Sequence, residues 1–184
     1  FTNHFLSDIQ QGLEQGTYVI VIGEITRWSS PTFTIVAVDV TNWTPNSSFN
    51  PSFTPFNGDA YDMIFQSDGK ILVGGEFTNF GASSTPYLLR LDANGSLDTS
   101  FTPDLNGPVH TIKQLDNGNI LIGGEFTLAD GEPAWRLVEL DQYWSVVANW
   151  ASQSFGPSAS AIYTLSELSD DQRLVGWSFT SIND

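Results

Sequence analysis

Three glutamates stand at the same place in a recurring glycine-bearing phrase, which reads VIGEIT, then ILVGGEFT, then ILIGGEFT. Glu76 and Glu125 are 49 residues apart, and Glu24 precedes Glu76 by 52. Carboxylates that converge on one site can act as general acids and bases or as metal ligands. An acid that recurs in each copy of a repeat has a simpler interpretation, a structural bond to a neighbouring unit or loop. We therefore expect Glu24, Glu76 and Glu125 to be structural, together with the repeat glycines Gly75 and Gly124.

A second acidic pattern, DANGSLD at 92–98, has the spacing of part of a calcium-binding loop. Asp92, Asn94 and Asp98 supply side-chain oxygens, but Ca²⁺ takes about six to eight oxygen ligands and the distal glutamate of such a loop is missing. The equivalent stretch of the next copy, DQYWSVV, keeps only Asp141. Two interpretations stay open, a calcium site and a β-turn stabilised by Asp and Asn side chains.

Other groups that carry chemistry are sparse. The chain contains no cysteine, which excludes disulfides, thiolate zinc ligands and thiol nucleophiles. His4 and His110 each lack a His-x-x-x-His companion, so the sequence has no zinc pattern. No G-x-S-x-G motif marks a serine nucleophile, and Gly-Gly-Glu lacks the Lys-Ser/Thr of a phosphate-binding loop. We therefore expect no enzymatic activity and, calcium aside, no cofactor.

The chain is strongly acidic, with 21 acidic residues, 6 basic residues and a net charge of -15. Six scattered cations cannot form the basic patch that binds nucleic-acid phosphate or an anionic membrane surface. No apolar run approaches the roughly 18 residues that a membrane-spanning helix needs. We expect no nucleic-acid partner and no membrane insertion.

The elements that position these residues repeat along the chain. Gly58, Gly107 and Gly156 follow one another at intervals of 49 residues, the same interval that separates the last two glutamates. Self-similarity at this period is typical of a repeat architecture. We therefore predict a single repeat-built domain whose units cover residues 1–57, 58–106, 107–156 and 157–184.

Each unit is predicted to consist of short strands. In the clearest copy we expect strands at 60–66, 70–77, 87–92 and 96–101, turns at Asp68-Gly69 and Ala93-Asn94-Gly95, and a loop at 78–86. No segment of helical periodicity with a cap stands out. Four antiparallel strands per 49 residues indicate an all-β chain of β-propeller blades, with about three full blades and a partial fourth.

The second predicted strand of the clearest copy, KILVGGEF, is a nearly continuous apolar run. Such a run suits a strand that adjacent blades cover on both faces. The paired glycines within it would admit a neighbouring sheet or a bulge, because they lack a side chain. A blade cannot bury its own faces, so the stacking of copies is expected to form the core.

The stretch DGKILVGGEFTNFGASSTPYLLRLDANGSLDTSF resembles the delta-60 repeat, a β-propeller repeat of bacterial secreted and phage proteins. That pattern runs roughly V-x-x-I-x-x-x-D-G-K-I-L-V-G-G-x-F, then a loop, then R-L-x-x-D-G-S-L-D-x-S-F. The match is strong over 58–106, good over 107–149, weaker over 5–57 and partial over 157–184. The resemblance implies propeller architecture and an extracellular, secreted or virion-surface setting. It carries over no catalytic residue, because the family has no established common enzymatic activity.

Aromatic residues occupy the loop between the second and third strands. Trp28 and Phe80 align there, and Asn79 lies beside Phe80. Exposed aromatic faces stack on sugar rings, and nearby polar side chains bond sugar hydroxyls. The alternative is that these rings fill the gap between blades. Trp28, Asn79 and Phe80 are therefore candidate ligand-binding residues with a structural alternative.

The sequence favours a non-enzymatic structural or adhesive module, for example a phage tail or fibre component. One alternative is a carbohydrate- or receptor-binding module that uses the loop aromatics. Another is a hydrolase, which would require a pocket with convergent carboxylates of perturbed pKa. Expected partners are other subunits or further repeats of a longer chain, and a glycan or cell-surface receptor under the first alternative. Because four copies of the first hairpin accompany three of the second, we expect a fragment of a longer array, an open arc, or a ring that a partner completes.

Overall fold

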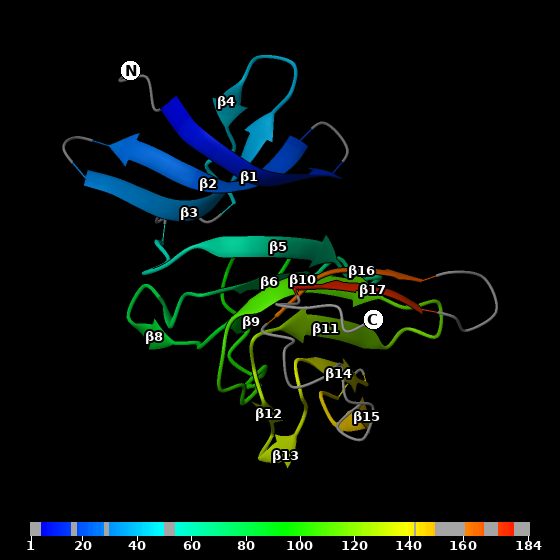
Figure 1. Cartoon of the computed structure of the whole chain (residues 1–184). Coiled ribbons are helices and arrows are strands. Elements are labelled where there is room, and N and C mark those ends of the chain that lie inside the picture. The colour runs from blue at the N-terminus through cyan, green and yellow to red at the C-terminus, as the bar shows by residue number, and fades with distance from the viewer. Residues whose placement is uncertain are drawn as a thin grey trace.

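The computed structural model describes residues 5–15, 18–27, 30–49, 54–141, 143–149, 161–167 and 173–178. Every regular element in this part of the chain is a β-strand, and the strands pair in antiparallel fashion (Figure 1). The predicted all-β class is therefore confirmed. The described residues contain no helix with the length and apolar character needed to cross a bilayer.

One main sheet corresponds to each predicted unit. The first contains β1 (Phe5–Gln15), β2 (Tyr18–Arg27), β3 (Ser30–Asp39) and β4 (Thr44–Pro45). The second contains β5 (Ala60–Phe65), β6 (Ile71–Gly75) and β9 (Leu88–Leu91). The third contains β10 (Val109–Gln114), β11 (Ile120–Gly124), β14 (Leu137–Leu140) and β15 (Val146–Asn149). In the fourth, the described strands are β16 (Ile162–Glu167) and β17 (Arg173–Trp177).

The second sheet lacks the fourth strand predicted at 96–101, so this prediction is wrong. An isolated bridge between Leu91 and Leu97 takes its place. The chain turns at Asp98 directly after this bridge, because Asp98 Oδ1 accepts hydrogen bonds from the Ser100 N–H and hydroxyl at 3.0 and 2.6 Å. In the third unit Val147 stands at the position of Asp98, and there β15 pairs with β14 as predicted.

The segment 78–86, predicted as a loop, contains a short hairpin of β7 (Asn79–Phe80) and β8 (Ser83–Ser84). Its turn includes Gly81 at a φ of 59°, a left-handed conformation that glycine adopts without strain. The third unit repeats this hairpin as β12 (Leu128–Ala129) and β13 (Glu132–Pro133). The segment was predicted as a loop because two-residue strands leave no alternation in the sequence.

The first strands of successive units lie side by side. β1 contacts β5, β5 contacts β10, and β10 contacts β16, while the remaining strands of each unit follow outward in chain order (Figure 1). Successive sheets that meet in this way are the blades of a β-propeller. We use the word blade for each sheet below.

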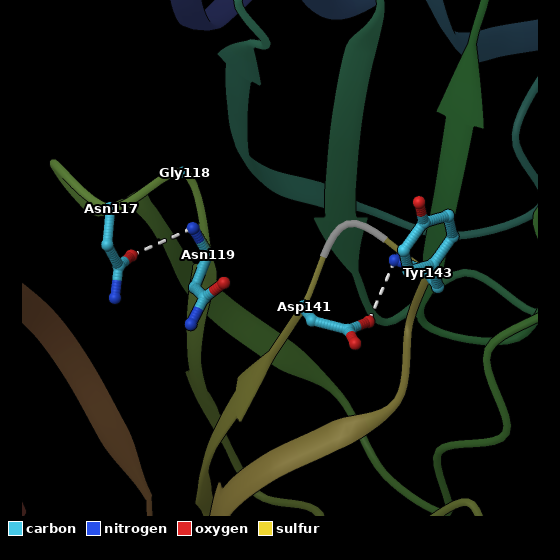
Figure 2. A pocket seen from close by; sticks show the side chains of 5 residues that line it. All are labelled: Asn117, Gly118, Asn119, Asp141 and Tyr143. Carbon is cyan, nitrogen blue, oxygen red and sulfur yellow. Dashed lines mark hydrogen bonds between the residues drawn. The ribbon is translucent and has the colours of Figure 1, made fainter.

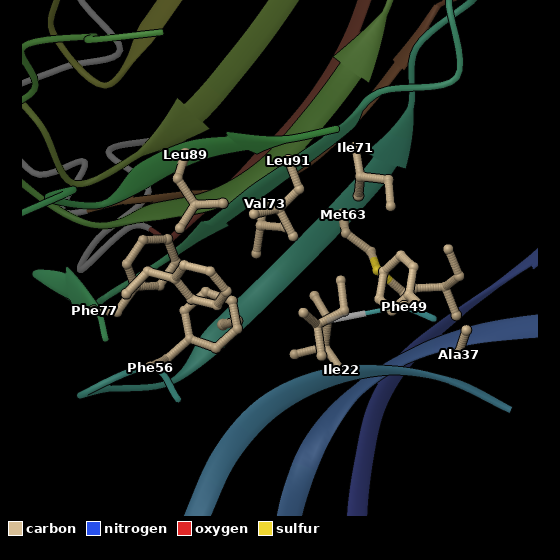
Figure 3. Close-up of a cluster of buried hydrophobic side chains, with 14 residues drawn as sticks. Ile22, Ala37, Phe49, Phe56, Met63, Ile71, Val73, Phe77, Leu89 and Leu91 are labelled. Atoms are coloured by element: carbon tan, nitrogen blue, oxygen red, sulfur yellow. The ribbon is translucent and has the colours of Figure 1, made fainter. Parts of the chain in front are cut away.

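Apolar clusters fill the spaces between successive blades. Ile22 and Ala37 of the first blade face Met63, Ile71 and Val73 of the second (Figure 3). Between the second and third blades, Leu72 and Leu88 pack against Val109, Ile112, Ile122 and Val138. Between the third and fourth blades, Leu121 and Leu137 pack against Ile162. Every residue of β6 and β11 is buried, which confirms that blades cover the second strand on both faces.

Each first hairpin contains a β-bulge at the same place. The register shifts between Ile9 and Gln11, between Ala60 and Asp62, between Val109 and Thr111, and between Ile162 and Thr164. The extra residue of the bulge is Tyr61 in the second blade, His110 in the third and Tyr163 in the fourth. A bulge that recurs with the repeat aims one extra side chain per blade in an equivalent direction.

Candidate functional site

The repeat glutamates bond to the bulge residues of their own blades. The Tyr61 hydroxyl donates to Glu76 Oε2 at 2.6 Å. His110 Nε2 donates to Glu125 Oε1 at 2.9 Å, since a carboxylate can only accept. The structure thus gives both acids a structural partner, although it lies within the blade and not in a neighbouring blade or loop as expected. Glu24 lies in β2, and its side chain is outside the described residues.

The bulge residues form a stack of rings that crosses three blades. The ring centroids of Tyr61 and His110 are 5.0 Å apart with an interplanar angle of 28°, and those of His110 and Tyr163 are 4.7 Å apart. Burial, followed by the hydrogen bond to Glu76, raises the pKa of Tyr61, so the phenol keeps its proton and remains a donor. This ring stack is missed from the sequence, where its signal is one aromatic or imidazole residue at the same place in the first strands of the second, third and fourth blades.

Two of the residues predicted to bind calcium, Asp92 and Asp98, lie in an ion cluster with Lys70 and Arg90. Lys70 Nζ lies 2.6 Å from Asp98 Oδ2 and 3.0 Å from Asp92 Oδ1. Arg90 binds the same Asp98 oxygen, with its Nε and NH2 atoms each at 2.8 Å. The ammonium of Lys70 thus lies between the two carboxylates, an arrangement that favours the structural interpretation of this segment over the calcium site. No group of metal-ligating side chains gathers in the described parts of the chain.

Asn94, the third predicted calcium ligand, is a turn residue. Its Oδ1 accepts a hydrogen bond from the backbone N–H of Ser96 at 3.0 Å. Gly95 follows it at a φ of 80°, and the Gly95 N–H bonds the carbonyl of Asp92 at 2.8 Å. The β-turn interpretation of this segment is thus the one that the structure supports.

The pKa of Asp98 lies well below its ordinary value. Burial alone would raise it, but the hydrogen bonds from Lys70 and Ser100 and the charge of Arg90 outweigh burial. Because the pKa of Asp98 is lower in the folded than in the unfolded protein, its ionised carboxylate stabilises the fold. This stabilisation has its full value above the unfolded-state pKa of about 3.9. That contribution is lost as the pH falls through the folded-state pKa.

We therefore expect the stability difference between the wild type and Asp98→Asn to be constant from about pH 7 to pH 5 and to shrink below about pH 4. The reason is that protonation removes from the wild type the charge that the substitution has already removed. Thermal unfolding of both proteins across this pH range measures the difference. A difference that is equally large at pH 7 and pH 2.5 would contradict the assignment of this carboxylate to the ion cluster.

The predicted ligand-binding residues of the second blade, Asn79 and Phe80, make contacts within the protein. Phe80 is only 4% exposed and packs on Phe56, with ring centroids 5.0 Å apart, so its ring is not available to a sugar. Asn57 Oδ1 accepts from the backbone N–H groups of Thr78 and Asn79 at 2.8 and 2.7 Å. Trp28 lies outside the described residues. For Phe80, then, the gap-filling alternative applies.

The third blade has a pocket where the second blade has its ion cluster. The pocket has a volume of about 180 Å³ and is lined by Asn117, Gly118, Asn119, Asp141 and Tyr143. Figure 2 shows the two asparagines on the β10–β11 turn and Asp141 and Tyr143 on the facing β14–β15 turn. Tyr143 is 77% exposed. No prediction from the sequence included this pocket, although Asp141 was recognised as the counterpart of Asp92.

Residues 66–101 and 115–146 match a family model described as domain of unknown function (DUF5122) beta-propeller. The two matched segments contain the second and third strands of the second and third blades, and with them both the ion cluster and the pocket. No curated protein and no solved structure matches the chain. The match supports a β-propeller repeat family, in agreement with the arrangement of the blades.

Proposed function

We propose that this β-propeller chain is a non-enzymatic structural or adhesive module of an extracellular or virion surface, and that it assembles through its blade faces. The observation that carries the proposal is a glycine that recurs in the second, third and fourth blades, where Gly74 and Gly123 lie on the face that meets the following blade. The third such glycine, Gly176, lies on the last described hairpin.

Two of these glycines form sockets between blades. A Cβ atom on Gly74 would lie 2.5 Å from Cγ1 of Val109, and one on Gly123 would lie 2.6 Å from Cγ2 of Ile162. In each case a β-branched residue from the first strand of the following blade occupies the space that a side chain would fill. Glycine at this position therefore permits the close approach of the following blade.

Gly176 occupies the same register position in the fourth blade, opposite Thr164. The atoms nearest to a Cβ built on Gly176 belong to Thr164 of its own hairpin. Leu174, on the same face by strand alternation, is 60% exposed, whereas its counterpart Leu72 in the second blade is fully buried. Among the described residues this face is therefore uncovered, which supports the docking of a further blade.

We assign the docking partner as the first strand of a second copy of the chain. Ile9 of β1 pairs with Gly23 just before the bulge, as Val109 pairs with Gly124 in the third blade. Ile9 is therefore a β-branched residue at the register position of Val109 and Ile162, the residues that lie against Gly74 and Gly123. A contact between the β16–β17 hairpin of one copy and β1 of another is heterologous, so it generates either a closed ring or a filament.

Leu174→Arg is expected to prevent this association, because a charge on the docking face would have to be desolvated. Light scattering should give a mass that is a multiple of 20.2 kDa for the wild type and 20.2 kDa for the variant. The matched control is Leu128→Arg, at a 40% exposed leucine of the β12–β13 hairpin, which should associate like the wild type. A wild type that stays monomeric at all concentrations would overturn the proposal.

The structural role and the extracellular or virion setting are supported by other features of the chain. The bonds of Glu76 and Glu125 within their blades support a structural role for the repeated acids. The cysteine-free, acidic composition and the resemblance to the delta-60 repeat support an extracellular or virion setting, and we propose that the repeat is of the delta-60 type. A carbohydrate-binding role is the second candidate, favoured by the pocket beside the exposed Tyr143.

A further inference from the structure

The pocket exists because the third blade departs from the repeat at the ion cluster. By the 49-residue period, Asn119 stands in the place of Lys70, and Asp141 in the place of Asp92. In the second blade the ammonium of Lys70 reaches to 3.0 Å from Asp92 Oδ1. The shorter side chain of Asn119 instead donates its amide to Glu139 Oε1 at 2.7 Å. The space in front of Asp141 is left as the pocket.

The other members of the ion cluster are replaced as well. Glu139 takes the place of Arg90, and Val147 takes that of Asp98. Glu139 is buried and also lies 3.3 Å from the guanidinium of Arg173 in the fourth blade, so its charge is paired away from the pocket. The third blade has therefore exchanged a self-contained ion cluster for an open polar pocket.

The polar side chains of the pocket are held in place by bonds to their own turns. Asn117 Oδ1 accepts from the Asn119 N–H at 2.9 Å. Asp141 Oδ1 accepts from the N–H groups of Tyr143 and Ser145 at 2.7 and 3.0 Å. These bonds commit one oxygen of each side chain and fix its orientation before any ligand arrives, which lowers the entropic cost of binding.

We propose that this pocket binds one ring of a neutral saccharide, with Tyr143 as the stacking platform. Asn117 Nδ2 is a donor, while Asn119 Oδ1 and Asp141 Oδ2 are acceptors, a mixture that suits hydroxyl groups because each hydroxyl both donates and accepts. The exposed tyrosine supplies the apolar ring face that such a site needs. The inference rests on the adhesive role proposed above and names its ligand class.

The size and charge of the pocket narrow the ligand further. Its volume of about 180 Å³ is below the range of about 300–1,000 Å³ that is usual for drug-sized ligands, so a single terminal ring fits and a buried oligosaccharide does not. Asp141 and the net charge of -15 repel acidic and sulfated sugars and free phosphate. A quaternary ammonium would use Tyr143 and Asp141 but would leave the two asparagine amides unmatched.

The test is saturation-transfer NMR of the full chain with the methyl glycosides of glucose, galactose, mannose and N-acetylglucosamine, and with choline as the cationic probe. At least one glycoside should bind, with a dissociation constant on the order of millimolar. Tyr143→Ala should weaken that binding at least about tenfold, because it removes the stacking face. Asn119→Lys should weaken it equally, since the lysine would refill the pocket as Lys70 does in the second blade.

The matched control is Trp43→Ala, at an aromatic residue that is 76% exposed and does not line the pocket. It should bind the glycoside like the wild type. Choline binding without glycoside binding, or equal glycoside binding by all variants, or no glycoside binding by the wild type, would each overturn the inference. The masses of the same samples separate this inference from the assembly proposal, because Tyr143→Ala should still associate and Leu174→Arg should still bind the glycoside.

Discussion

Gly124→Ala is expected to lower the free energy of unfolding by about 3 kcal/mol or more. A Cβ atom at this position would lie 2.0 Å from the carbonyl oxygen of Pro108 and 3.0 Å from Cα of Val109. Both are backbone atoms of the blade's own first hairpin, so the strand itself must move to admit a methyl group. At about 2–4 °C per kcal/mol for a domain of this size, the midpoint should fall by roughly 6–12 °C.

Two further alanine substitutions show whether the close approach is the cause. Gly75→Ala should be as damaging, because its Cβ would lie 2.1 Å from the carbonyl oxygen of Asp59 at the equivalent place in the second blade. Gly118→Ala is the control, at a turn glycine with a φ of 88° and no atom within 4 Å of an added Cβ. It should cost only about 1–2 kcal/mol, the strain of a left-handed residue. A Gly124→Ala variant that melts like the control would contradict the blade geometry.

Asp98→Asn is expected to lower the free energy of unfolding by about 2–4 kcal/mol at neutral pH. The substitution leaves Arg90 and Lys70 facing a neutral amide, and the side chain of Asp98 is only 8% exposed. This loss is somewhat smaller than the usual cost of breaking a buried ion pair, because the Lys70 side chain is 29% exposed and water can partly replace the carboxylate. Chemical denaturation with urea measures the change.

Asp92→Asn is the matched control for that change. It removes a carboxylate from the same lysine, but the Asp92 side chain is 49% exposed. Exposed ion pairs contribute about 0–1 kcal/mol, so this variant should unfold close to the wild type. Equal destabilisation by the two substitutions would show that burial of Asp98 does not set the strength of the cluster.

The fold was predictable from the sequence because its information is local and repeated. The short apolar runs, the glycines of the turns and the 49-residue period are all visible in the sequence, and they indicate all-β blades. The end of a strand depends on side-chain bonds that the strand pattern does not show. The segment at 96–101 has the sequence of a strand, but Asp98 Oδ1 accepts from Ser100 in a turn that follows the single bridge at Leu97.

The functional candidates were harder to predict, because burial and contact between turns decide them. Phe80 matched a loop aromatic by alignment, yet Phe56 covers it. Asp92 and Asp98 matched a calcium pattern, yet the sequence does not show that Lys70 lies between their carboxylates. The 49-residue period shows that Asn119 replaces Lys70, but only the structure shows that this replacement leaves a pocket in front of Asp141.

The contact between copies can be tested by disulfide cross-linking. Because the chain has no cysteine, any disulfide must form between the two cysteines that are introduced. A Cβ built on Gly74 lies 3.0 Å from Cβ of Val109, and one on Gly123 lies 3.2 Å from Cβ of Ile162, both close to the spacing of about 3.5–4.5 Å in a disulfide. The double variant Gly74→Cys with Val109→Cys should therefore form an internal bond, which verifies the chemistry. The test itself mixes an Ile9→Cys protein with a Gly176→Cys protein under mild oxidation.

A second copy that docks on the last described hairpin should give a disulfide-linked species of twice 20.2 kDa in the mixture, and little of it from either variant alone. If the mixture gives no more linked product than the separate variants while the internal control bond forms, the chain does not associate through this blade face.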